Sequence, residues 1–173
     1  MKELENYILD SKDLMKMIKL VVDKKNPKRE LNYLHYEAKT QRLIATDTLS
    51  MLIVDCKIDY KEDLYIDVVA SSRQLVCSND DLKFPNYQRI VPQSYDSSYD
   101  NIYDLVRDKA LRFPVYNKRI QSLITLIKEL KSVSKVTYNA SGCVYCIEFS
   151  LNNAKCKLLF MTNSFNEKYD VKC

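Results

Sequence analysis

The chain has 173 residues, 46% of them hydrophobic and 29% charged, and a formal net charge of +4. This length and composition are typical of one globular domain with a buried core, and no apolar run reaches the ~20 residues that a membrane-spanning helix needs. Because the N-terminal residues also lack a signal-peptide pattern, we expect a cytoplasmic protein. The small positive charge permits contact with a polyanion without demanding it.

Residues 4–58 predict a strand, a helix and three further strands. Residues 4–9 are strand-like. Asp10 or Ser11 is a good N-cap for a helix over residues 12–22, where apolar residues recur at helical spacing. Three strand-like runs follow, at residues 31–37, 42–46 and 50–58.

The last third of the chain repeats this order. Asn117 is a plausible N-cap for a helix over residues 118–131, and strand-like runs follow at residues 135–138, 143–150 and 155–161. Aligned on their caps, the apolar positions of the two helices coincide: Leu14, Met17, Ile18 and Val21 match Ile120, Leu123, Ile124 and Ile127. We therefore predict an α+β fold in which a duplicated β-α-β-β-β unit packs two helices on antiparallel sheets. Residues 1–173 would form a single domain, with repeat halves at about 5–58 and 110–163 joined by 59–109.

Three segments lie between these halves. Residues 63–70 are strand-like, and residues 83–92 contain two prolines. Proline fixes its own φ and pushes the preceding residue toward extended geometry, so we expect an ordered, extended connector there. In residues 95–108, Tyr-Asp pairs recur every four residues. Aspartates so spaced repel one another on a helix, which favours an exposed loop or weak helix over a calcium loop that would lack its glycine and closing glutamate.

Six cysteines and one histidine raise the question of a metal site. Cys143 and Cys146 have the spacing of a zinc knuckle, with Cys156 further on, but no second close pair accompanies them. The segment around Cys146 is strand-like, and residues three apart on a strand point to opposite faces. We expect buried, reduced cysteines and no metal or other cofactor. His35 is isolated in sequence, which favours a strand or surface position over a catalytic base.

A basic face on each helix is the remaining functional feature. With one glycine in the chain and no nucleophile beside a base, we expect a protein that is not an enzyme. A solvated helix face is the ordinary interpretation of such a stripe. The functional one is contact with DNA phosphates that is blind to sequence, because base-reading aromatic or amide side chains are missing among these lysines. The residues concerned are Lys12, Lys16, Lys19, Lys118, Arg119, Lys128 and Lys131.

Two motifs carry a resemblance to a known family. The first is Ala-Thr-Asp at residues 45–47, and the second is Phe-Pro-Asn-Tyr-Gln-Arg-Ile-Val-Pro at residues 84–92. They resemble the Ala-Thr-Asp-Gly turn and the Phe-Pro-Asp-Tyr-Arg-Arg-Val-x-Pro stretch of the bacterial DNA sliding clamp, the β subunit of replicative DNA polymerase. Domains of that family consist of two β-α-β-β-β halves whose helices line a ring around DNA. Thr48 stands at the family's glycine and Ser50 at its arginine.

The resemblance implies a processivity or partner-recruiting role in DNA replication. It implies double-stranded DNA held by the helix lysines, and a pocket for short extended peptides of DNA polymerase or other clamp-binding-motif proteins. The matching pocket positions are Thr46, Met51, Pro85, Arg89 and Ile90. Family members carry three such domains per chain, so a ring would require this chain to form a homo-oligomer. The alternative is a phage or mobile-element inhibitor or adaptor that binds a host protein, with residues 95–108 as an acidic surface.

Overall fold

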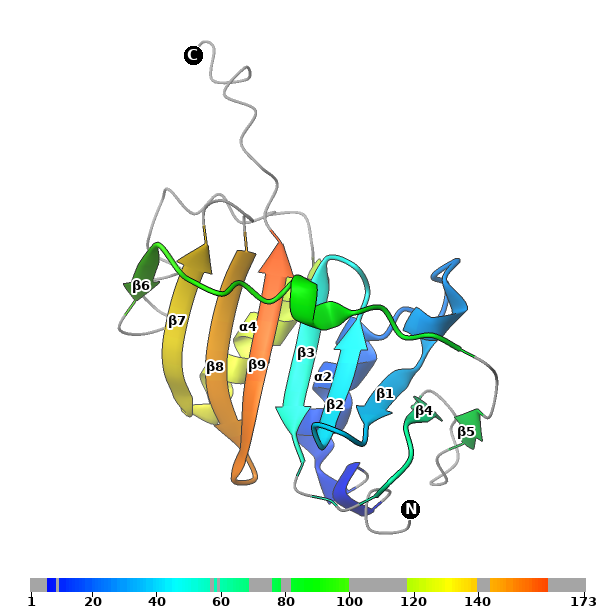
Figure 1. Ribbon diagram of the computed structural model, residues 1–173. Helices are drawn as coiled ribbons and strands as arrows, with labels where there is room; N and C mark the ends of the chain where they lie inside the picture. Colours follow the sequence, from blue (N-terminus) through cyan, green and yellow to red (C-terminus); the bar gives the residue numbers. More distant parts are fainter. Residues whose placement is uncertain are drawn as a thin grey trace.

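The computed structural model describes residues 6–8, 10–56, 58, 60–68, 76–78, 82–99, 118–139 and 144–161. Within these ranges, strands from both parts of the chain join in one sheet, and two helices pack against it (Figure 1). None of the helices described is long and apolar enough to cross a membrane.

The two helices agree closely with the sequence prediction. Helix α2 spans Lys12–Val21, and the side chain of Ser11 caps it by accepting a hydrogen bond from the Leu14 amide at 3.3 Å. Helix α4 spans Lys118–Leu130. Both predicted apolar faces are confirmed, since the buried residues are Leu14, Met17, Ile18 and Val21 in α2, and Ile120, Leu123, Ile124 and Ile127 in α4.

All strand pairings of the sheet are antiparallel, and the strand order is β5-β4-β1-β2-β3-β9-β8-β7-β6. The strands are β1 (Leu34–Glu37), β2 (Arg42–Thr46), β3 (Ser50–Asp55), β4 (Leu64–Asp67), β5 (Val76–Ser78), β6 (Ser97–Tyr99), β7 (Val133–Asn139), β8 (Val144–Leu151) and β9 (Ala154–Met161). The central pair, β3 and β9, brings Leu52 opposite Leu158. The expectation of helices on antiparallel strands is confirmed, but the sheet is one rather than several.

Strands β1, β2 and β3 come after α2, and strands β7, β8 and β9 come after α4, close to the predicted ranges, while β4, β5 and β6 lie between these two sets in the chain. The strand predicted before the first helix is wrong, because residues 6–8 and 10 are helical. A short run such as Tyr7-Ile8 fits a strand or a helical turn equally by periodicity. The contact of fully buried Ile8 with the core on the helix side of the sheet favours the turn. The matching strand before the second helix, at residues 113–115, lies outside the described residues.

Three further expectations need correction. The proline-bounded connector, residues 83–92, is not extended throughout: the 3-10 helix η2 (Tyr87–Arg89) interrupts it, closed by a hydrogen bond from the Ile90 amide to the Tyr87 carbonyl at 2.9 Å. In segment 95–108, Ser97–Tyr99 form β6 rather than a loop or weak helix, because the edge of β7 offers backbone hydrogen bonds to them. Another 3-10 helix, η1 (Arg29–Asn32), replaces the start of the strand predicted at 31–37.

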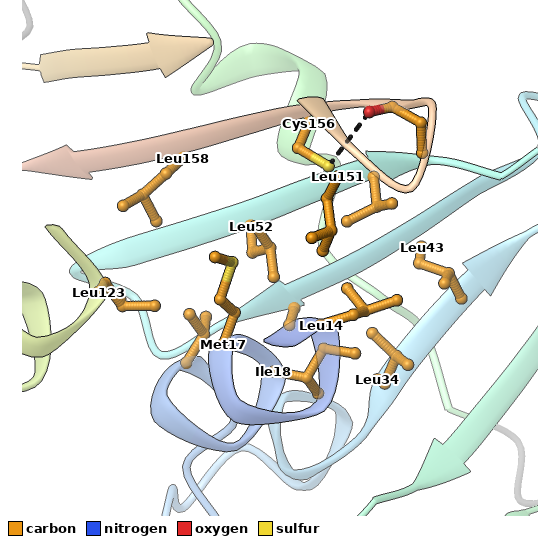
Figure 2. Close-up of a cluster of buried hydrophobic side chains, with 14 of the residues drawn as sticks. Leu14, Met17, Ile18, Leu34, Leu43, Leu52, Leu123, Leu151, Cys156 and Leu158 are labelled. Atoms are coloured by element: carbon orange, nitrogen blue, oxygen red, sulfur yellow. Dashed lines mark hydrogen bonds between the residues drawn. The ribbon is translucent and has the colours of Figure 1, made fainter. Parts of the chain in front are cut away.

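The sheet separates two cores. Helices α2 and α4 cover one face, where alternate strand residues such as Leu43, Leu52 and Leu158 meet Met17 and Leu123 (Figure 2). On the opposite face the connector crosses the central strands (Figure 1). There Tyr87 is buried in a smaller cluster with Ile44, Met51, Ile53, Val144, Cys146 and Leu159. The connector is therefore a packed element of the fold, and its side chains are held against the sheet.

Candidate functional site

Three exposed apolar side chains gather at one point on the connector side of the sheet. Leu49, Ile90 and Met161 are 51%, 45% and 41% exposed, and in the part of the chain that the structure describes they are the large apolar side chains that remain exposed. All three line one small pit of about 20 Å³. A single exposed apolar side chain is ordinary, but a contiguous group of them is typical of an interaction site.

The pit is assembled from distant parts of the chain. Leu49 comes from the turn between β2 and β3, Ile90 from the connector and Met161 from the end of β9. The backbone amide of Met161 donates a hydrogen bond to the Leu49 carbonyl at 2.8 Å, which joins two of the three segments. The remaining residues around the pit are Thr46, Thr48, Ser50, Met51, Val144, Leu159 and Phe160.

A network of polar contacts fixes the turn that carries Leu49. The buried carboxylate of Asp47 accepts hydrogen bonds through Oδ1 from the Leu49 amide at 2.9 Å, the Ser50 amide at 2.6 Å and the Ser50 hydroxyl at 3.0 Å. The hydroxyl of Thr46 donates to the Ser50 carbonyl at 2.8 Å and accepts from the Thr48 amide at 3.2 Å. Side chains of Asp and Thr that bond to nearby amides stabilise tight turns in this way. Leu49 is thus presented by an ordered turn.

Thr48 occupies a conformation that favours glycine. Its φ is 82°, in the left-handed region where a β-branched residue is strained. This is the position at which the resembling motif carries glycine, so the turn has a glycine-like backbone without the glycine. The hydrogen bonds made by Asp47 and Thr46 hold the turn in one conformation, and this offsets the strain at Thr48.

The structure brings some of the predicted pocket residues together. Thr46, Met51 and Ile90 line the pit, as expected. Pro85 instead lines a separate cleft of about 530 Å³ with His35 and Glu37, and exposed Arg89 ends η2 without lining the pit. Sequence reasoning missed Leu49 and Met161. The signal for Leu49 was an apolar residue inside an otherwise polar turn.

The predicted basic residues form a second feature on the opposite, helix side. Between α2 and α4 runs a groove of about 800 Å³ that is lined by Lys16, Lys19 and Lys118 together with Leu20, Gln121, Ser122, Thr125 and Leu126. Three lysines and no carboxylate line this groove, so its local charge is positive. Lys12 and Lys131 are exposed and Lys128 is half-buried, and none of the three lines the groove.

Lys118 and Arg119 occupy the first turn of α4, where no acidic residue accompanies them. Cations at a helix N-terminus oppose the helix dipole and destabilise the helix by about 0.3–1 kcal/mol each. Their placement therefore costs stability and makes this end of the groove more attractive to an anion.

Arg119 also connects the helix layer with the turn at the pit. Its guanidinium nitrogens lie 3.7 Å from Asp23 Oδ1, just after α2, and 3.9 Å from Asp47 Oδ2. Because the Arg119 side chain is 48% exposed, these ion pairs are weak individually. They nevertheless place a predicted phosphate-binding residue beside the carboxylate that organises the Leu49 turn.

The cysteines and the acidic segment give no further site. Cys56, Cys146 and Cys156 are buried and free, and burial raises the pKa of Cys56 and of Cys156 to about 12. Cys146 and Cys156 belong to cores on opposite faces of the sheet, while Cys143 lies outside the described residues. Among the residues described, no group of three His, Cys, Asp or Glu side chains could hold a metal ion. Residues 100–108 of the acidic segment also lie outside the described ranges.

No protein-family model matches the chain, and no curated protein does. Among solved structures, the chain is similar to the Helicobacter pylori beta clamp, crystallised bound to a DNA ligase peptide, with 19% sequence identity and a TM-score of 0.37. That match covers 96% of this chain and 50% of the clamp chain, so this chain spans half the length of its structural neighbour. A likeness at this TM-score assigns neither a fold nor a function.

Proposed function

We propose that this protein has a clamp-like fold with a duplicated helix-and-strand unit, and that it recruits partners during DNA replication. A short extended segment of a partner docks at the pit, and duplex DNA lies along the basic groove between α2 and α4. The observation that carries the proposal is the convergence of Leu49, Ile90 and Met161 on one pit. The protein acts in the cytoplasm, as a homo-oligomer where it encloses DNA, and has no catalytic activity of its own.

The pit offers an apolar surface to a peptide anchor at its rim, since its interior of about 20 Å³ holds no more than about one water molecule. Its floor is made of buried apolar residues, including Met51 and Leu159, and its rim of the three exposed ones. Burial of one aliphatic or aromatic side chain contributes about 1.5–3 kcal/mol, so two anchors contribute about 3–6 kcal/mol before the cost of association. Further contacts along the peptide must supply the remaining affinity. Pockets for spaced apolar side chains are one way in which proteins recognise extended peptides.

The groove suits the DNA backbone. It holds three lysines, two from α2 and one from α4, and the side-chain amide of Gln121 can also donate to phosphate oxygens. The hydroxyls of Ser122 and Thr125 donate to backbone carbonyls of α4 instead. If each lysine neutralises one phosphate, the logarithm of the binding constant falls with the logarithm of the salt concentration with a slope of about −2.7. Such binding is sensitive to salt and indifferent to base sequence.

The test for the pit is peptide binding. Labelled short peptides with leucine and phenylalanine anchors, and matched peptides with serine at the anchors, are titrated against the protein and followed by fluorescence anisotropy. We expect the anchored peptides to bind, and the double variant Leu49→Ser/Met161→Ser to lose this binding while Leu49→Met keeps it. Failure of every anchored peptide to bind, or equal binding to the double variant, contradicts the proposal.

DNA retention separates this proposal from the adaptor alternative. A phage or mobile-element adaptor could use the same pit for a host protein without holding DNA. Retention of duplex DNA of unrelated sequences at low salt, lost at high salt, supports the replication role. Peptide binding without any DNA retention supports the adaptor.

A further inference from the structure

His35 is buried with one ring nitrogen unpaired. The side chain is 5% exposed and lies on β1, on the side of the sheet that the connector covers. In the part of the chain described here, its Nδ1 is the buried side-chain nitrogen or oxygen atom without a hydrogen-bond partner. An unpaired buried acceptor lowers the stability of a fold and needs a reason.

The first residues of the connector pack against the imidazole ring of His35. The ring of Phe84 stacks on it with centroids 4.5 Å apart and planes 13° apart, and the Tyr65 ring lies 4.9 Å away. The Tyr65 hydroxyl accepts a hydrogen bond from the Phe84 amide at 2.7 Å and donates one to the Leu82 carbonyl at 2.8 Å. His35 and Tyr65 together therefore hold the first residues of the connector against the sheet.

The charges around His35 do not remove the cost of protonating it. Burial lowers its pKa and outweighs three groups that raise it: the carboxylates of Asp63, before β4, and Glu37, on β1, and a backbone hydrogen bond with Leu64. Glu37 is already engaged, since its Oε2 accepts hydrogen bonds from the Tyr87 and Thr40 hydroxyls. The charged and titratable groups that line the cleft with His35 are Glu37, Lys39, Asp63, Tyr65, Lys83 and Tyr87.

We propose that His35 is an acid-sensitive latch: neutral, it holds the connector on the sheet, and once protonated it releases the connector. A proton on Nδ1 would be a buried charge without an acceptor, and opening the connector returns it to water. The aromatic rings of Phe84 and Tyr65 attract a cation and offset part of this cost, but they do not replace the missing acceptor. Because Ile90 lies on the connector, opening also removes one wall of the pit. That consequence rests on the proposed peptide binding, but the latch itself does not.

The direction of the pH effect follows from the lowered pKa. The closed state binds the proton less readily than the open state, whose histidine has the ordinary pKa of 6.5. Closure is therefore fully favoured above that value and weakens as the pH falls below it toward the lower pKa of the closed state. Between about pH 7.5 and 5.5 the ratio of open to closed connector should rise, with about tenfold as the upper limit set by the ordinary pKa of 6.5 in the open state.

Hydrogen exchange tests the latch without any peptide ligand. The full chain is exchanged at both pH values, with rates corrected for intrinsic chemistry, and protection is compared between residues 82–92 and strands β8 and β9. We expect a loss of protection of up to about tenfold in the connector and none in the strands. The variant His35→Phe keeps a ring for Phe84 to stack on but cannot take a proton, and its connector should show no such pH dependence.

Two results would overturn the latch. One is equal connector protection at the two pH values in the unaltered protein. The other is an NMR titration of His35, the single histidine of the chain, with a midpoint at or above the ordinary value of 6.5. This titration uses the unaltered protein and so decides the matter even if His35→Phe fails to fold. Either result leaves peptide binding at neutral pH untouched.

Discussion

Replacement of Thr48 by glycine should stabilise this protein. Thr48 has a φ of 82° and an exposed side chain, so the substitution relieves backbone strain and removes little packing. A residue with a Cβ in the left-handed region costs roughly 1–2 kcal/mol, whereas glycine gives back about 0.5–1 kcal/mol through the greater freedom of the unfolded chain. The net expectation is a gain of about 0.5–1 kcal/mol in the free energy of unfolding.

Thermal unfolding measures this gain. For a chain of this length, a stabilisation of 1 kcal/mol raises Tm by about 2–4 °C, so Thr48→Gly should unfold about 1–4 °C higher than the unaltered protein. Thr48→Ala is the matched control, because alanine keeps the Cβ that causes the strain and should leave Tm nearly unchanged. Peptide binding at the pit should persist in both variants, since the turn keeps its conformation.

A lower Tm for Thr48→Gly would refute this reasoning. It would mean that the hydroxyl or methyl group of Thr48 contributes more than the strain costs. An equal rise for Thr48→Ala would also refute it, because the effect could then not come from the left-handed backbone.

Three further predictions concern the turn, the groove and the buried thiols. Asp47→Ala removes the acceptor of three hydrogen bonds and should lower the free energy of unfolding by about 1–3 kcal/mol in urea titrations. Asp47→Asn should lower it less, and an unchanged urea midpoint for Asp47→Ala would contradict the role of this turn. The double variant Lys16→Ala/Lys118→Ala should reduce the salt slope of DNA binding by about 2, whereas Lys155→Ala, an exposed lysine outside the groove, should leave it unchanged. Because burial raises the pKa of Cys56 to about 12, its thiol should resist iodoacetamide at mildly alkaline pH until the protein is unfolded. Peptide mass mapping measures this labelling, and rapid labelling of Cys56 in the native protein would contradict the prediction.

Local sequence patterns determined the helices and most strands. The spacing of Leu14, Met17, Ile18 and Val21 predicts which face of α2 is buried, because helical periodicity depends only on near neighbours. The same holds for α4. Strands β2, β3, β8 and β9 were predicted from apolar runs, and the burial of β2 and β3 on both faces follows from the helices on one side of the sheet and the connector on the other. Residues 6–8 and 97–99 were predicted wrongly, because contacts with distant parts of the chain decide their conformation.

The residues of the candidate site were likewise predicted only in part. The resemblance in residues 45–47 and 84–92 predicted Thr46, Met51 and Ile90, which the structure does bring to one pit. Met161 and Leu159 join them only because β9 pairs with β3 in a register that sets Met51 opposite Leu159. The sequence favours only a strand or surface position for His35, because the stacking of Phe84 on its ring depends on how the connector packs against the sheet. The sequence by itself thus determined the elements and their buried faces, which follow from short-range periodicity. Only the tertiary structure decided which exposed side chains meet, because strand pairing and connector docking join residues far apart in the chain.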